Sequence, residues 1–126
     1  MTSSRTRGFT LIEILVVMAI LATLLSLAAP KYFDSLERAQ EAALRTDLRM
    51  FREAIDKHRG DTGKLPASLD ALVQARYLQA VPVDPITDRT DTWVVVPSAD
   101  VSVPGVFNVR SGAPGAARDG TAYASW

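Results

Sequence analysis

The feature that most constrains this chain is an apolar run close to its N-terminus. Residues 9–29 read FTLIEILVVMAILATLLSLAA. At a rise of ~1.5 Å per residue this run makes a helix of about 32 Å, long enough to cross a hydrocarbon layer of ~30 Å. The run also takes a large share of the apolar residues, so the rest of the chain has to fold around a small core. We expect one membrane-embedded helix followed by one small domain, residues 30–126.

The segment before the run is short, polar and basic. Residues 1–8 read MTSSRTRG and include Arg5 and Arg7. Positive charge ahead of an apolar helix favours a cytoplasmic N-terminus, so the domain after the helix would face outward. Two simpler interpretations stay open. One is a plain single-span anchor, and the other is a secretory signal cut after Ala29, although the apolar part of such signals is only ~7–15 residues long.

One acidic residue, Glu13, interrupts the run. A carboxylate in the centre of a lipid-embedded helix costs ~2.5–3.5 kcal/mol, and residues 9–29 contain no Lys, Arg or His to pair with it. Cleavage between Gly8 and Phe9 would remove a leader peptide and create an α-ammonium four residues away. Two opposite charges ~4 Å apart attract by about 4 kcal/mol at an effective dielectric of ~20. The amine could belong to the same chain or to a neighbouring copy, and the alternative is a protonated Glu13.

Beyond Pro30, which should kink or loosen the helix, an amphipathic pattern predicts a helix over 30–59 with glycine stops at Gly60 and Gly63. Its apolar stripe consists of Leu36, Leu44, Leu48, Phe51 and Ile55. A helix over residues 9–59 would be about 76 Å long, more than the ~65 residues that follow can cover. We therefore expect lipid, and later other subunits, to bury its first half.

The remaining residues predict a small headgroup of the α+β class. A short helix is expected over about 68–79, and prolines further along would end it. Residues 93–96 and 106–109 are β-branched and aromatic, as is typical of strands, and 121–126 is a candidate third strand. The expected architecture is a long helix packed on a small antiparallel sheet within 93–126.

Composition excludes several classes of function. The chain has 14 basic and 14 acidic residues and no strongly basic stripe. Because a surface that binds nucleic-acid phosphates needs clustered positive charge, nucleic-acid binding is not expected. It has no cysteine, which excludes disulfides and thiolate metal sites. The only histidine, His58, has no nucleophile pattern near it and is interpreted as a helix-end residue. We find no catalytic constellation or phosphate loop, so an enzyme is not expected.

Residues 7–13, RGFTLIE, together with the apolar run and Pro30, resemble the class III signal of type IV pilins and type II secretion pseudopilins. The resemblance implies that a prepilin peptidase cuts after Gly8 and methylates the new N-terminal Phe9. It implies that Glu13 is the assembly glutamate and Pro30 the helix-kinking proline. It also implies a precursor in the bacterial inner membrane with its headgroup in the periplasm, and self-assembly into a filament. The implied partners are minor pseudopilins and an inner-membrane assembly platform with a cytoplasmic ATPase.

Within that family, residues 61–66 (DTGKLP), the short helix and residues 83–85 (VDP) resemble the major pseudopilin of type II secretion. The absence of cysteine favours this subgroup, because surface pilins often carry a C-terminal disulfide. We therefore expect a structural subunit of a pseudopilus that drives protein export. The alternative is a type IV pilin of a surface fibre for adhesion, motility or DNA uptake. An enzyme or binding domain on a plain anchor is the third hypothesis.

The same subgroup commonly holds a calcium ion in its C-terminal loop through carboxylates and backbone oxygens. Calcium needs 6–8 oxygen ligands, and the candidates here are Asp84, Asp88 and Asp91, with Asp119 as the only acid of the C-terminal loop. The alternative is that these aspartates make turn and capping hydrogen bonds, which Asp does readily. The expectation is a chain without a cofactor, with these four residues as the calcium candidates.

Overall fold

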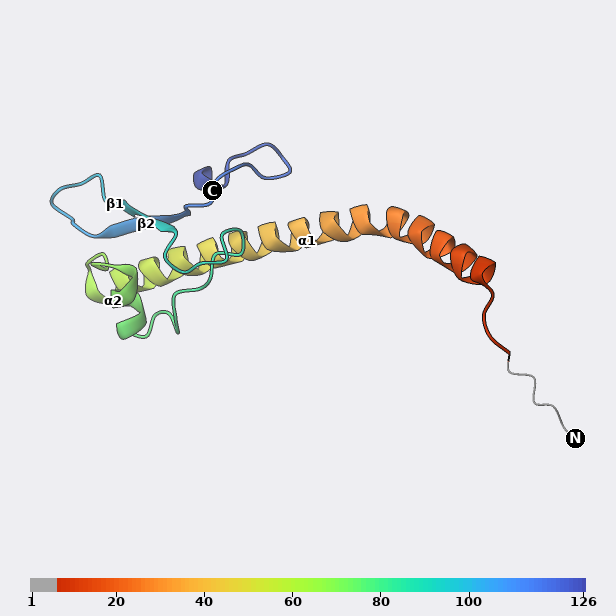
Figure 1. The fold of residues 1–126 in the computed structure, drawn as a ribbon. Coiled ribbons are helices and arrows are strands. Elements are labelled where there is room, and N and C mark those ends of the chain that lie inside the picture. The colour runs from red at the N-terminus through yellow and green to blue at the C-terminus, as the bar shows by residue number, and fades with distance from the viewer. Residues whose placement is uncertain (1–6) are drawn as a thin grey trace, which may run out of the picture. The chain divides into compact units, whose positions relative to one another are not determined.

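A computed structural model describes residues 7–126. The predicted leader, residues 1–8, lies outside the described part except for its last two residues. The chain forms two compact units, one up to Glu37 and one from Arg38 onward, and each is described by itself. The long helix α1, Leu11–Thr62, contributes to both units (Figure 1).

The first unit consists of α1 up to Glu37 and the residues that lead into the helix. Its large apolar side chains are exposed, among them Phe9 at 81% and Leu11 at 78%. Within residues 7–126, α1 is the one helix long and apolar enough to cross a membrane. Helix α1 continues through Pro30, and the missing N–H of this proline removes one helical hydrogen bond. Leu36, predicted to belong to the apolar stripe of the headgroup, is 44% exposed and lies outside the core.

In the second unit, α1 supplies one wall of the headgroup core. The predicted apolar stripe is confirmed from Leu44 onward, and these side chains of α1 are buried: Leu44, Leu48, Phe51, Ala54 and Ile55. The predicted stop at Gly60 is wrong, because the helix continues to Thr62. Gly63 ends it with a φ of 72°, a conformation that glycine adopts without strain, and its N–H bonds the carbonyl of Arg59 at 2.8 Å.

Helix α2 spans Leu69–Gln74 and is shorter than the predicted 68–79. Ser68 caps its start, accepting a hydrogen bond from the N–H of Ala71 at 3.1 Å. At its end the N–H of Tyr77 bonds the carbonyl of Leu72 and the N–H of Arg76 bonds that of Val73. This pair of bonds is a Schellman motif. The helix therefore stops well before the prolines that were expected to end it.

The Schellman motif gives a testable prediction, since Arg76 holds a φ of 65° that costs an ordinary residue free energy. Arg76→Gly is expected to raise the stability of the chain by up to about 1 kcal/mol, a rise in Tm of about 4–8 °C. The measurement is thermal unfolding of the full chain in detergent. The matched variant Arg59→Gly, inside α1, should instead lower Tm, because glycine within a helix is unfavourable. An equal change in Tm in both variants would contradict the left-handed conformation of Arg76 at the end of α2.

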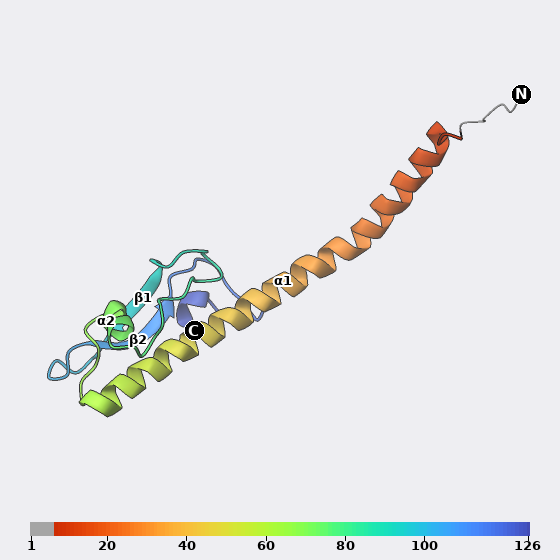
Figure 2. The same ribbon diagram turned by 90° about the horizontal axis from the view of Figure 1, so that it is seen from below.

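The sheet has two antiparallel strands, β1 at Trp93–Pro97 and β2 at Val106–Ser111. Trp93 pairs with Ser111 and Val95 with Val109. Phe51 of α1 meets Trp93 edge to face, with ring centroids 4.9 Å apart. Figure 2 shows α2 and the two strands beside the C-terminal part of α1. The predicted α+β class, with a long helix and a small antiparallel sheet, is confirmed.

The predicted third strand at 121–126 is wrong. The segment forms a short 3-10 helix, Tyr123–Ser125, and pairs with its neighbour only through an isolated bridge between Ala116 and Ala122. Tyr123 is buried in the core, and its ring meets that of Trp126 edge to face with centroids 5.3 Å apart. In a strand, residues three positions apart point to opposite faces. Tyr123 and Trp126 could therefore not pack on each other if this segment were a strand.

Candidate functional site

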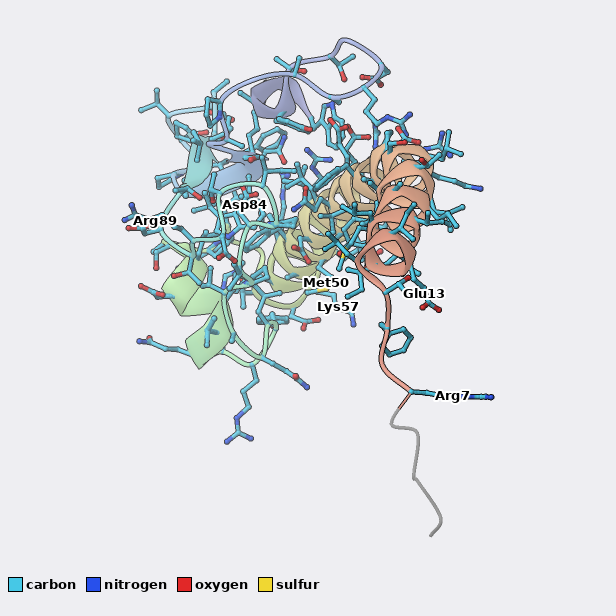
Figure 3. The ribbon with its side chains drawn as sticks, turned by 45° about the vertical axis from the view of Figure 1, so that its right-hand side comes forward. Arg7, Glu13, Met50, Lys57, Asp84 and Arg89 are labelled. Atoms are coloured by element: carbon cyan, nitrogen blue, oxygen red, sulfur yellow. The ribbon has the colours of Figure 1, made fainter. Side chains whose placement is uncertain are left out.

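The start of α1 carries a reciprocal pair of hydrogen bonds between Thr10 and Glu13. The N–H of Glu13 donates to Oγ1 of Thr10 at 3.2 Å, and the N–H of Thr10 donates to Oε2 of Glu13 at 3.4 Å. This arrangement is a capping box, in which two backbone donors of the first helical turn are satisfied by side chains. Figure 3 shows Glu13 on the first turn of α1. The acid therefore also meets the positive end of the helix dipole, which favours a carboxylate there.

Glu13 lies in the first turn of α1 and not at the centre of the helix, where a carboxylate would cost ~2.5–3.5 kcal/mol in lipid. The cost near a helix end is smaller, because the side chain can reach the interface. Cleavage before Phe9 would place an ammonium one residue from the N–H of Thr10 that already donates to Glu13. The charge pair predicted from sequence is thus compatible with this geometry and remains a prediction.

The predicted cleavage position precedes the helix. Gly8 and Phe9 are exposed and belong to no helix or strand. A Cβ added at Gly8 would meet nothing within 4 Å. Glycine at this position is therefore not required by packing within the chain. A requirement for glycine would have to come from an enzyme that binds this segment.

Two aromatic residues follow the apolar run directly. Tyr32 and Phe33 are exposed, and their rings meet edge to face with centroids 5.7 Å apart. Aromatic side chains of this kind, with Lys31 beside them, are typical of the boundary between lipid and water. Sequence reasoning missed this pair, although its position at the end of the run was a usable signal. It also missed the Thr10 cap, which the spacing Thr-x-x-Glu would have indicated.

The buried Asp84 is a structural centre of the headgroup. It is fully buried, and its Oδ1 accepts the N–H of Ile86 at 2.8 Å while its Oδ2 accepts the hydroxyl of Ser111 at 2.5 Å. The hydroxyl oxygen of Ser111 in turn accepts the N–H of Ala113 at 3.1 Å. Asp84 therefore joins the turn that follows it to the end of β2. Burial raises the pKa of Asp47 on α1, and the charge of Asp84 raises it further.

The calcium candidates do not lie together. Within residues 7–126 no group of three or more His, Cys, Asp or Glu residues is placed to hold a metal ion. Asp91 accepts two hydrogen bonds from Arg89, at 2.8 and 2.6 Å, which lower its pKa. Asp88 takes a φ of 57° and donates its N–H to the carbonyl of Asp84 at 2.7 Å. The carboxylates of Asp84 and Asp91 are thus already engaged within the loop, and Figure 3 shows Asp84 and Arg89 on the headgroup.

The fourth candidate, Asp119, is also engaged. Its Oδ1 accepts the N–H and the hydroxyl of Thr121, at 3.0 and 2.6 Å, and its Oδ2 lies 3.6 Å from Nη2 of Arg45. The bonds from Thr121, and to a lesser degree the charge of Arg45, hold the pKa of Asp119 below its usual value. A calcium ion would need 6–8 oxygens around it. The residues that the sequence offers for calcium do not fit the ion.

Residues 3–29 match the model of the prokaryotic N-terminal methylation motif. The type II secretion system core protein G of Klebsiella pneumoniae is 34% identical over 97 aligned positions, which cover 64% of this chain and 69% of that protein. The protein of the same name from Aeromonas hydrophila is 31% identical and is covered over 71% of its length. That of Pectobacterium carotovorum is 36% identical over 81 positions, 52% of its length. No solved structure matches the chain.

These similarities cover both parts of the molecule. The methylation motif covers the predicted cleavage position, the capped start of α1 and the apolar run. The relatives are similar over about two thirds of the chain. The resemblance expected from RGFTLIE and from the headgroup pattern is thereby confirmed, and the chain belongs to the family of the type II secretion system core protein G.

Proposed function

We propose that this chain is a structural subunit of a type II secretion pseudopilus, made as a membrane-anchored precursor and assembled with copies of itself into a helical filament. The observation that carries the proposal is the first unit, where α1 exposes its apolar side chains on every face and begins with the capping box of Thr10 and Glu13. Such a surface is stable only in lipid or against other apolar helices. The role is structural rather than catalytic.

The mechanism follows from exchanging one apolar environment for another. In the membrane, lipid covers the apolar side chains of α1, and Tyr32 and Phe33 mark the outer boundary of the lipid. In the filament, α1 helices of neighbouring copies replace the lipid. Because lipid is as apolar as leucine, this exchange gains little from the hydrophobic effect, and close packing together with the Glu13–ammonium pair has to supply the specificity. The energy for extraction would come from a cytoplasmic ATPase acting through an inner-membrane platform.

The charges before the apolar run bear on the side of the membrane on which the headgroup lies. Arg5 and Arg7 favour a cytoplasmic N-terminus, which places the headgroup in the periplasm. A prepilin peptidase would cut after Gly8 and methylate Phe9, and minor pseudopilins would join the same filament. A surface pilin is not favoured, since the relatives compared above are all named as secretion-system proteins.

The proposed function is tested in the native host. Deletion of the gene is expected to leave exported proteins trapped in the periplasm, and complementation with the wild-type gene should restore their export. Surface fibres and twitching motility serve as the control readouts. Normal export together with a loss of surface fibres would contradict the proposal and favour the pilin alternative.

Processing gives a sharper prediction. Gly8→Leu is expected to leave an unprocessed precursor, heavier than the mature chain by ~1 kDa, because the enlarged side chain would block a peptidase that reads a glycine there. The measurement is intact mass of the membrane-extracted protein. Gly60→Leu is the matched control, since a Cβ at either glycine meets nothing within 4 Å of the chain. Normal cleavage of the Gly8 variant would contradict the assigned cleavage site.

A further inference from the structure

The C-terminal segment, residues 113–126, is attached to the headgroup by side chains of α1 that lie on one face. These are Glu41, Arg45 and Arg52, spaced four and seven residues apart, which places them along one side of the helix. Figure 1 shows the segment running beside the C-terminal part of α1. All three side chains belong to the same unit as the segment.

Arg45 makes two different contacts with the segment. Its Nη2 lies 3.6 Å from Oδ2 of Asp119. The central carbon of its guanidinium lies 3.9 Å from the centroid of the Trp126 ring, a cation–π contact. Trp126 is in turn tied back to the segment, because its indole N–H donates to the hydroxyl of Thr121 at 2.7 Å. The guanidinium of Arg45 therefore contacts both an acidic side chain, Asp119, and an aromatic side chain, Trp126, of the segment.

The two flanking residues bind main-chain atoms. Oε1 of Glu41 accepts the N–H of Arg118 at 2.9 Å and lies 3.4 Å from the hydroxyl of Tyr123. Arg52 donates from Nη2 to the main-chain oxygen of Trp126 at 2.7 Å and from Nε to the side-chain oxygen of Asn108 on β2 at 2.9 Å. These contacts fix the segment at both ends of its path along α1.

We propose that the C-terminal segment is held against α1 by the guanidinium of Arg45 in place of a calcium ion, so that this headgroup folds independently of calcium. The only acidic side chain of the segment, Asp119, already has both oxygens engaged by Thr121 and Arg45. A divalent cation at this carboxylate would face the positive charge of Arg45 and would have to displace it. The inference concerns the headgroup alone and stands whether or not the chain forms a pseudopilus.

The test is amide hydrogen exchange of the full chain in detergent, followed by mass spectrometry of peptides from 113–126 and from β1 and β2. In the wild type, millimolar calcium chloride and EGTA should give the same protection of residues 113–126. Arg45→Gln should speed exchange in 113–126 by at least about tenfold while β1 and β2 stay protected, and added calcium should not restore it. Arg59→Gln, which removes an equal charge from an exposed part of the same helix, should leave exchange unchanged.

Three results would overturn the proposal. They are a loss of wild-type protection in EGTA, unchanged exchange in Arg45→Gln, and rescue of that variant by calcium. If Arg45→Gln also exposed β1 and β2, the wild-type comparison between calcium and EGTA would still decide which cation holds the segment.

Discussion

Glu13→Leu is expected to insert into the membrane as well as the wild type and yet to lose at least about tenfold in filament yield. Insertion should survive because leucine is more favourable than glutamate in lipid. Assembly should fail because the carboxylate that accepts the N–H of Thr10, and that would pair with the Phe9 ammonium, is removed. A pair worth about 4 kcal/mol by Coulomb's law exceeds the 1.4 kcal/mol that corresponds to a factor of ten. The measurement is the amount of sheared filament relative to membrane-bound precursor.

A second substitution separates the two roles of Glu13. Glutamine can still accept the N–H of Thr10 and complete a capping box, but it carries no charge. If the charge pair drives assembly, Glu13→Gln should fail as Glu13→Leu does. If capping is sufficient, it should assemble normally, and the charge-pair explanation would then be wrong. Glu37→Gln removes an exposed acid from the same helix and should assemble as the wild type does.

Asp84→Ala is expected to destabilise the headgroup by about 3 kcal/mol, which corresponds to a fall in Tm of roughly 12 °C or more. The substitution would leave the Ser111 hydroxyl and the N–H groups of Ile86 and Thr87 without the acceptor they have now, in a fully buried position. Buried donors without an acceptor are costly because water cannot replace the lost partner. Relief of the repulsion on Asp47 offsets only a small part of this loss.

Thermal unfolding of the full chain in detergent measures the effect. Asp84→Asn keeps one acceptor oxygen and should fall between the wild type and Asp84→Ala. Asp91→Ala is the matched control, because Asp91 is exposed and contacts Arg89 at the surface, where an ion pair contributes little. An equally large fall in Tm in Asp91→Ala and Asp84→Ala would contradict the role given to the buried hydrogen bonds of Asp84.

The apolar run, the stripe from Leu44 to Ile55 and the two strands were predictable because each is a local pattern with its own period. The features that sequence reasoning missed depend on other kinds of information. α2 ends at a left-handed Arg76, a residue that gives no glycine signal. The 3-10 helix at 123–125 replaces a strand because Tyr123 and Trp126 pack on each other.

The roles of Gly8, Phe9 and Glu13 come from a short motif and stay predictions. The cap from Thr10 required attention to the chemistry of helix starts. The contacts of Glu41 and Arg52 with the C-terminal segment join residues more than seventy positions apart. No local pattern encodes such pairs, so the attachment of the segment could not be derived from the sequence alone.

The headgroup core has a consequence for how such a chain can change over evolutionary time. Among the described residues, every fully buried side chain lies at Leu44 or beyond, so substitutions within residues 9–29 leave folding of the headgroup untouched. An exchange of headgroups between relatives at a junction near Arg38 should therefore give chimeras that still fold.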